Sequence, residues 1–453
     1  MAKKSHEINM TEGPVFGKIV AFTIPLLLTS LLQLLYNAAD VVVVGRFAGE
    51  QSLAAVGATT SLINLIVNLF MGMAVGAGVV VSQAIGAKDK EKLSKIIHTS
   101  MFLSVILGFL VGAIGFFVSK PLLMLMGTPD DVMQKANLYV KVYFLGLPGL
   151  MIYNFGAAIL RSAGDTKRPL YILTFSGIIN VILNLLFVIS FKMDVAGVAA
   201  ATVISQYISA AAVVVILLKE KSDFKLSLNK LKMDLNCLGL IVQFGVPMGV
   251  QSSLFSVSNV LIQSSINSFG SVVMAGNAAG ANIEGFVYVA ANSGSQAVLS
   301  FVGQNFGARK YDRIKKVIFS SMLYAVMVTS IFSFAAVFFK DALLRIYTDS
   351  APVIAAGGKR LLIICSFHII CGFMDIMANS ARGMGKSLVP MIITLFFVCV
   401  MRVVCVYTVF AAVPKIEVLY WSYPVTWGLA FIAHSIYFAV TYSKYKKQQI
   451  SNA

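Results

Sequence analysis

Charged side chains are rare within the long apolar stretches of this sequence, and the first stretch carries an acid. Asp40 stands in NAADVVVVGRF (37–47), near the end of an apolar run that begins near Val15. A carboxylate near the centre of an isolated membrane helix costs about 2.5–3.5 kcal/mol, so such an acid is a candidate for function. In an internal cavity, burial would favour the protonated carboxyl, and Asp40 could take up and release a proton. Alternatively, Asp40 is a helix-end residue in headgroup water, because only four valines separate it from Gly45.

A second polar set lies in the other half of the sequence. Glu284, Asp375 and Arg402 fall in three separate apolar runs. If they cluster, their net charge of −1 could hold a proton, a sodium ion or a cationic substrate. Alternatively, Arg402 and one acid form a structural ion pair. His368 precedes Asp375 by one to two helical turns and could join a proton relay, or it is simply hydrogen-bonded.

The composition indicates a membrane protein. Hydrophobic residues make up 58% of the 453 residues and charged residues only 12%, with a mean hydropathy of +0.85, whereas soluble proteins carry about 25% charged residues. The apolar runs do not alternate as the strands of an outer-membrane barrel do. The net charge of +17 would suggest nucleic acid in a soluble protein. Here we attribute it to basic loops, and expect the lipid bilayer as a partner and no nucleic acid.

The elements that must position these residues are membrane helices. One span needs about 20 apolar residues, and the sequence therefore predicts an all-α integral membrane protein with twelve transmembrane helices. Lys and Arg concentrate in the breaks on one side, so we expect both termini in the cytoplasm and the protein in the cell membrane. The five cysteines form no C-x-x-C pair, so no resident metal is expected. The predicted spans lie near residues 15–44, 52–82, 94–119, 136–160, 169–191, 195–218, 238–267, 273–303, 315–339, 353–380, 389–411 and 417–442.

The two halves of the sequence repeat each other. GKIVAFTIP (17–25) returns as GLIVQFGVP (239–247), 222 residues later, and at the same spacing Asn37 falls on Asn259. Six spans return the chain to its starting side, so the halves are expected to be related by a pseudo-two-fold axis along the membrane normal. The predicted organisation is an N-terminal six-helix lobe, a cytoplasmic linker and a C-terminal six-helix lobe, at residues 1–218, 219–237 and 238–453.

Several short motifs occur in a definite order along the chain. They are Pro25 fifteen residues before Asp40, AAVGA (54–58), SQAIGAKD (82–89), RSAGDTKRP (161–169), NVILNLLF (180–187), GVAAATVISQ (197–206), FGVP (244–247) and GQNFGA (303–308). In their order and spacing, and with the repeat, they resemble the multidrug and toxic compound extrusion (MATE) transporters, bacterial branch, over essentially the whole chain.

The resemblance implies a cation site in the first half. In such transporters the positions of Asn180, Asn184 and Thr202 line this site together with the acid of the first span. Relatives frequently have a second Asp where this chain has Asn184. One negative charge fewer favours proton binding at Asp40, with Na⁺ at Asp40, Asn180, Asn184 and Thr202 as the alternative. The two asparagines could also merely hydrogen-bond across helices.

Helix bending is the second expectation from the first span. Pro25 removes a backbone hydrogen bond and makes bending cheap, so cation binding at Asp40 could be linked to a bend. Residues expected to line the substrate cavity or to take part in this movement are Tyr36, Asn37, Asn259, Gln263, Arg402 and His368.

The sequence thus predicts a secondary antiporter. It would export cationic or amphiphilic organic compounds in exchange for protons or sodium, as a monomer and without a cofactor beyond the coupling ion. A flippase for lipid-linked oligosaccharides is the alternative; it would need several Arg or Lys residues in its cavity, and Arg402, near the middle of its predicted span, is the only one that is clearly intramembrane. An enzyme is not expected, because H-E-x-x-H and G-x-S-x-G are both absent.

Overall fold

The protein is all-helical over the residues that the computed structural model describes, 7–451. The helices of the first half are α1 (Val15–Phe47), α2 (Glu50–Ala87), α3 (Lys90–Leu125), α4 (Asp130–Leu145), α5 (Leu147–Ser162), α6 (Lys167–Leu185) with a π-helical continuation at Leu186–Ser190, and α7 (Asp194–Lys219). A short 3₁₀ turn at Leu228–Lys230 precedes the second half.

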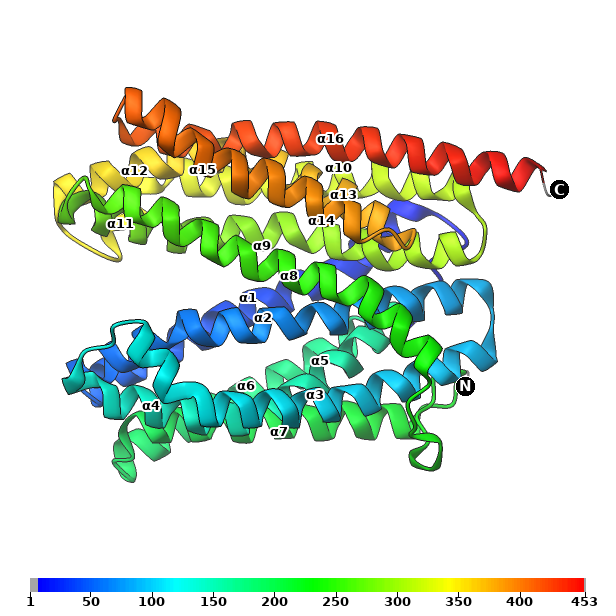
Figure 1. The fold of residues 1–453 in the computed structure, drawn as a ribbon, viewed down its shortest axis with the longest axis horizontal. Helices are drawn as coiled ribbons and strands as arrows, with labels where there is room; N and C mark the ends of the chain where they lie inside the picture. Colours follow the sequence, from blue (N-terminus) through cyan, green and yellow to red (C-terminus); the bar gives the residue numbers. More distant parts are fainter. Residues whose placement is uncertain (1–6, 452–453) are drawn as a thin grey trace. The chain divides into compact units, whose positions relative to one another are not determined.

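The second half has a corresponding series (Figure 1). Its helices are α8 (Leu235–Asn267), α9 (Ser271–Gly307), α10 (Tyr311–Phe338), α11 (Lys340–Arg345), α12 (Ala351–Ser366), α13 (His368–Gly383), α14 (Leu388–Thr394), a π-helical stretch at Leu395–Val400, α15 (Met401–Cys405), a second such stretch at Val406–Phe410, and α16 (Ile416–Ser451).

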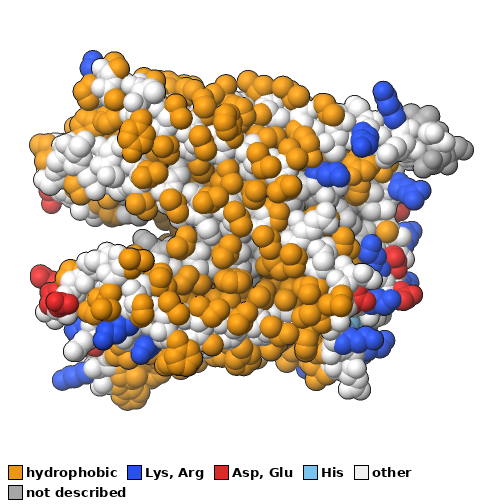
Figure 2. All heavy atoms as spheres, in the orientation of Figure 1, with side chains coloured by type: hydrophobic (Ala, Val, Ile, Leu, Met, Phe, Trp, Pro, Cys, Tyr) orange, Lys and Arg blue, Asp and Glu red, His pale blue; other side chains and the backbone are white. Residues whose placement is uncertain are grey.

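The helices are long and apolar enough to span a membrane. Within residues 7–451, nine single helices qualify, or up to eleven spans if the bent pairs α4 with α5 and α12 with α13 each count as one. The remaining long helix, α9, coincides with the predicted eighth span. On the face drawn in Figure 2, hydrophobic side chains cover the middle of the helices, and charged side chains gather near helix ends. The predicted all-α membrane fold is confirmed, whereas the number of twelve spans stays a prediction.

The internal repeat is visible in the backbone. The bends between α4 and α5 (46°) and between α12 and α13 (44°) occur at corresponding places in the two halves. Gly49 and Gly270, which precede α2 and α9, both have φ of 87°. Residues other than glycine rarely adopt this backbone conformation, so glycine allows the tight connection between the first two helices of each half.

Contacts divide the chain into two compact units. The first unit contains Leu28–Ser253 and the described residues up to Ile8, and the second contains Asn9–Leu27 and the described residues from Leu254 onward. Both α1 and α8 are therefore shared between units, with divisions shortly after Pro25 and Pro247 respectively. The segment predicted as a linker packs within the first unit, where the backbone N–H of Ser227 donates to His98 Nε2 at 3.0 Å. The predicted lobe boundaries at 218 and 238 stay a prediction.

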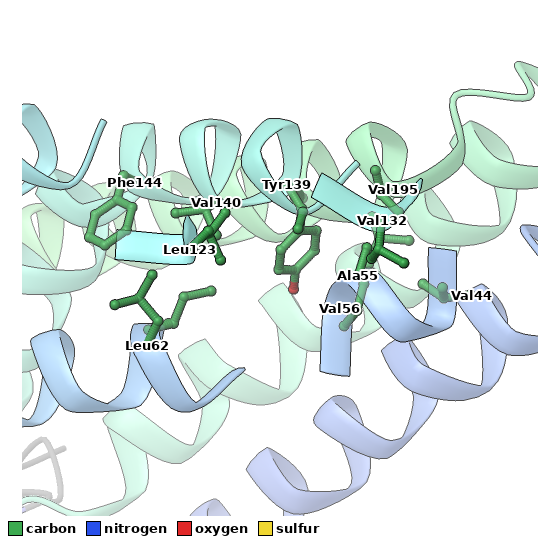
Figure 3. Packing of buried hydrophobic residues seen from close by; sticks show 14 of the residues in the cluster. Val44, Ala55, Val56, Leu62, Leu123, Val132, Tyr139, Val140, Phe144 and Val195 are labelled. Atoms are coloured by element: carbon green, nitrogen blue, oxygen red, sulfur yellow. The ribbon is translucent and has the colours of Figure 1, made fainter. Parts of the chain in front are cut away.

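The first unit has a continuous apolar core. Leu62 of α2, Leu123 of α3, and Val140 and Phe144 of α4 pack together with Tyr139 (Figure 3). Close approach of helices also depends on missing side chains. A Cβ on Gly76 of α2 would lie 2.5 Å from the backbone nitrogen of Gly245 on α8, so these two backbones pack directly against each other. This packing holds rigid the helices that surround the polar residues of the unit.

Candidate functional site

A polar cavity of about 420 Å³ lies within the first unit. Asp40 lines it and is half-buried. Tyr36, Asn37, Asn180 and Thr202 line the same cavity, so five of the residues singled out from the sequence are brought together. The other lining residues are Gln33, Asn64, Val67, Asn68, Met71, Tyr139, Tyr143, Leu150, Tyr153, Asn154, Leu173, Ser176, Gly177, Ser205, Gln206 and Ser209.

Asp40 accepts its side-chain hydrogen bond from a neutral amide. Asn184, which is fully buried, donates from Nδ2 to Asp40 Oδ1 and to Asn180 Oδ1, the latter at 3.2 Å. Asn180 donates onward to Thr202 Oγ1 at 3.4 Å. Among the described residues, Asp40 takes part in no ion pair within 4.0 Å. Its carboxylate therefore stands in a neutral network of amide and hydroxyl groups.

The local structure of α1 and α6 explains this meeting. Asn180 and Asn184 are one turn apart and share a face of α6. One turn before Asp40, the ring of Tyr36 lies over Gly177 of α6, where a Cβ would come within 1.9 Å of it. The Tyr36 hydroxyl donates to the Thr174 carbonyl at 3.3 Å. Helix α1 continues to Phe47, so Asp40 lies in the helix body, and its hydrogen bond from Asn184 shows that it faces α6. How deep Asp40 lies in the membrane stays a prediction.

Aromatic and amide side chains of the cavity were missed from the sequence. Tyr139 and Tyr143 of α4 stack with ring centroids 6.3 Å apart. Asn64 and Asn68 of α2 also line the cavity. Each pair is spaced by one helical turn inside an apolar run, and this regular spacing is the signal that could have identified them. Aromatic faces beside a carboxylate can bind an organic cation through cation–π and charge interactions.

The acids of the second unit have different surroundings. Arg360 of α12 forms an ion pair with Glu284 of α9 at 2.6 Å and donates to Asn277 at 2.7 Å. Asn277 donates to Gln263 at 3.1 Å. The alternative of a structural ion pair between Arg402 and one acid is wrong, because Glu284 pairs with Arg360 and Arg402 takes part in no ion pair within 4.0 Å among the described residues. Arg402, expected to be the only basic residue clearly in the membrane, is not the only buried arginine of this unit, since Arg360 is 6% exposed within α12.

Asp375 lies apart from that pair. Among the described residues it forms no ion pair within 4.0 Å, and Arg382 follows it by seven residues on the same helix. Arg382 is 6% exposed and donates to Asn379 at 2.8 Å. Glu284 and Asp375, the two acids of this unit singled out from the sequence, share its interior with three buried arginines, so the predicted net charge of −1 is not found. The arginines are Arg360, Arg382 and Arg402.

Arg402 and His368 are buried among aromatic rings. The Arg402 guanidinium lies 4.0 Å from the ring centroid of Tyr423, and its Nε donates to Thr426 at 3.0 Å. The His368 ring packs against Trp427 at 5.1 Å. Neither ring nitrogen of His368 has a hydrogen-bond partner in the described part of the chain, so the predicted relay to Asp375 is not formed in this conformation.

Two further residues singled out from the sequence are exposed. Gln263 donates to Asn267 at 2.8 Å besides accepting from Asn277. Asn259 is exposed on α8. Neither lines the cavity of the first unit.

The donor set around Asp40 contains oxygens that could serve Na⁺ as well as a proton. Asn180, Asn184 and Thr202 each carry one such oxygen, and the Oδ1 of Asn184 is buried without a hydrogen-bond partner in residues 7–451. Within that range, no group of three His, Cys, Asp or Glu side chains is placed to hold a metal ion. The site therefore offers one carboxylate, whose single negative charge can be balanced either by a bound proton or by a monovalent metal ion.

Comparison with known proteins agrees with this architecture. The MatE family model matches residues 25–186 and 247–408, which confirms the repeat at a spacing of 222 residues. The chain is similar to the probable multidrug resistance protein YoeA of Bacillus subtilis (strain 168), at 28% identity over 446 residues and 96% of each chain. It is also similar to the multidrug export protein MepA of Staphylococcus aureus (strain COL), at 22% identity over 84% of this chain and 85% of the relative.

Solved structures share the fold. An outward-facing multidrug resistance MATE family transporter of the MOP superfamily superimposes with a TM-score of 0.91 at 23% identity, over 98% of this chain and 100% of that chain. The structure called MATE in the bent conformation gives 0.89 at 22% identity, over 97% and 98%. The family model covers well over half of the sequence, in two segments that coincide with the structural repeat. The chain therefore belongs to the MATE family of transporters.

Proposed function

We propose that this protein is a secondary multidrug antiporter that exports cationic or amphiphilic organic compounds. The observation that carries the proposal is Asp40, a carboxylate with neutral partners in a cavity of about 420 Å³. The names of its relatives, multidrug resistance and multidrug export proteins, support export of small molecules. We place the protein in the cell membrane as a monomer, with both termini in the cytoplasm.

The proposed coupling ion is the proton, with sodium as the alternative. A coupling ion can drive transport only if it binds the two conformations with different affinity. Protonation of Asp40 removes the only formal charge among the residues that line the cavity, and would release a bound cation. Substrate and proton would then compete for one carboxylate, which is the simplest form of exchange.

The test is transport in liposomes that contain purified protein. A fluorescent organic cation is followed while a proton gradient or a sodium gradient is imposed separately. Wild type should move the dye with one gradient, and Asp40→Asn should lower that rate at least about tenfold, because the uncharged side chain cannot exchange a proton.

Asp223→Asn is the matched control. Asp223 is an exposed acid paired with Lys90 at 3.0 Å and does not line the cavity, so its loss should leave transport unchanged. Normal ion dependence in Asp40→Asn would exclude Asp40 from coupling. Absence of gradient-driven dye movement by wild type would favour the lipid flippase.

A further inference from the structure

The interior of the second unit contains buried hydrogen-bond donors that lack acceptors. Arg402 is 2% exposed, and while its Nε bonds to Thr426, its Nη2 has no partner within residues 7–451. Arginine keeps its charge and can only donate, so the missing partner must be an acceptor. Burying a guanidinium without a carboxylate partner is energetically unfavourable. The unpaired Nη2 therefore indicates that a partner absent from the protein itself binds here.

Other groups around the same aromatic rings are also unsatisfied. His368, 1% exposed, has two ring nitrogens without partners, and Arg360 Nε and Tyr420 Oη likewise have none among the described residues. Trp427 connects His368 and Arg402, because its ring lies 5.1 Å from the His368 ring and 5.8 Å from the Arg402 guanidinium carbon. The unsatisfied atoms therefore gather around α16, with contributions from α12, α13 and α15.

The charge of this cluster is positive. Arg360 and Arg402 carry two positive charges, and Glu284 supplies one negative charge that is already engaged by Arg360 at 2.6 Å. Asp375, the other acid singled out from the sequence in this unit, lies on the same helix as Arg382, seven residues before it. One positive charge is left at Arg402, where cation–π contact with Tyr423 at 4.0 Å compensates only part of the lost hydration.

We infer that the second unit binds a singly charged anion at Arg402 and His368, against Trp427. Nη2 of Arg402 donates to the anion, and the His368 ring supplies an N–H donor from whichever nitrogen is protonated. The shared chemistry is one compact negative charge, either a free halide or the carboxylate group of a transported compound. The inference does not depend on ion coupling at Asp40.

The two tryptophans of the chain make the site measurable without transport. Trp427 is buried at 5% exposure, whereas Trp421 is 45% exposed. In a Trp421→Phe background Trp427 is the only indole. Because it is buried, free iodide in solution quenches it inefficiently by collision. Iodide held at Arg402 should quench its emission along a saturating curve. The titration is made on the full chain in detergent, with ionic strength held constant by sulfate.

Arg402→Gln in the same background should raise the dissociation constant for iodide, obtained from the saturating quenching curve, at least tenfold. Arg402→Lys keeps the charge but loses the guanidinium fork, so it should weaken binding as well, and it serves if the Gln variant does not fold. Arg345→Gln, at an exposed arginine on α11, is the matched control and should change nothing. In a Trp427→Phe protein, exposed Trp421 should show only a linear response to iodide.

Competition identifies the source of the anion. Relief of quenching by chloride alone assigns a halide site, and relief by acetate or benzoate assigns a carboxylate site. The inference is overturned if iodide gives no saturating phase, if neither type of competitor relieves it, or if the phase is the same in the Trp421→Phe parent and in its Arg402→Gln and Arg402→Lys variants.

Discussion

The two repeat-related units carry acids in opposite electrostatic settings. In the first unit, Asp40 accepts from the neutral amide of Asn184. In the second unit, Glu284 is paired with Arg360 at 2.6 Å. Removing the charge of Asp40 strands no opposite charge, whereas neutralising Glu284 would leave a buried arginine unpaired. An acid that must gain and lose a proton belongs in the first setting, and an acid that holds helices together belongs in the second.

The largest expected difference is that the acid of the first unit affects ion coupling, whereas the acid of the second unit affects the free energy of unfolding. Asp40→Asn should lower gradient-driven transport at least about tenfold and change the free energy of unfolding by less than about 1 kcal/mol, since no charged partner is left unpaired. Glu284→Gln should retain the response to the gradient and lower the free energy of unfolding by about 3 kcal/mol. Dye transport in liposomes and unfolding in detergent measure the two quantities. The comparison would be inverted if Glu284→Gln lost coupling and Asp40→Asn kept it.

Arg360 gives the next largest effect. Replacing it by Met removes the partner of buried Glu284, and we expect a loss of about 3–5 kcal/mol in the free energy of unfolding. Its neighbour Lys359 is the matched control, because it pairs with Glu417 at 2.7 Å but both side chains are largely exposed, 57% and 39%. Lys359→Met should cost at most about 1 kcal/mol. Equal effects of the two substitutions would show that the Arg360 pair is not structurally important.

Arg360 also illustrates the limit of reading the sequence. It follows Lys359 directly in GGKRLL, and the two look alike in a list of basic residues. Consecutive residues of an α-helix point about 100° apart, so one can face the interior while the other faces solvent. Which of them does so depends on how α12 packs on α9 and α16. In the first unit, by contrast, Asn180 and Asn184 stand one turn apart, and this local spacing together with the family motifs was enough to place them with Asp40.

The repeat, too, predicts position better than chemistry. At the repeat spacing, Asn37 falls on Asn259, but the residue corresponding to Asp40 is Ile262, which is 2% exposed in the core of the second unit. The bends and the positive-φ glycines recur because they depend on backbone geometry. The polar side chains differ because each unit satisfies its buried charges separately.

Adding a carboxylate to the first unit tests why the site favours a proton. In Asn184→Asp, a second acid would replace the amide that donates to Asp40. Two nearby carboxylates repel each other and attract a cation, so sodium should stabilise the variant against unfolding. We expect an increase of about 1.4 kcal/mol or more, equivalent to tenfold tighter binding. Asn154→Asp, at another cavity position without a contact to Asp40, is the control. Equal sodium effects in both variants would point to non-specific charge.

The prolines of α1 and α8 provide the smallest and most direct comparison. Pro25 and Pro247 occupy equivalent positions, and in both helices the division between the contact units follows a few residues later. Beyond Pro25, α1 carries Asp40; beyond Pro247, α8 carries no charged side chain. Restoring a backbone donor stiffens either helix, but only in α1 would stiffness resist a movement coupled to protonation.

Pro25→Ala should therefore lower gradient-driven transport several-fold, with Pro247→Ala changing it less than about twofold. The rates are measured in the same liposomes, with the amount of folded protein checked for each variant. If Pro247→Ala lowered transport more than Pro25→Ala did, α8 and not α1 would be the helix that bends during transport. The bending of α8 would then depend on ligand binding in the second unit. In that case the surroundings of Arg402 and its proposed anion, and not those of Asp40, would differ between the two conformations.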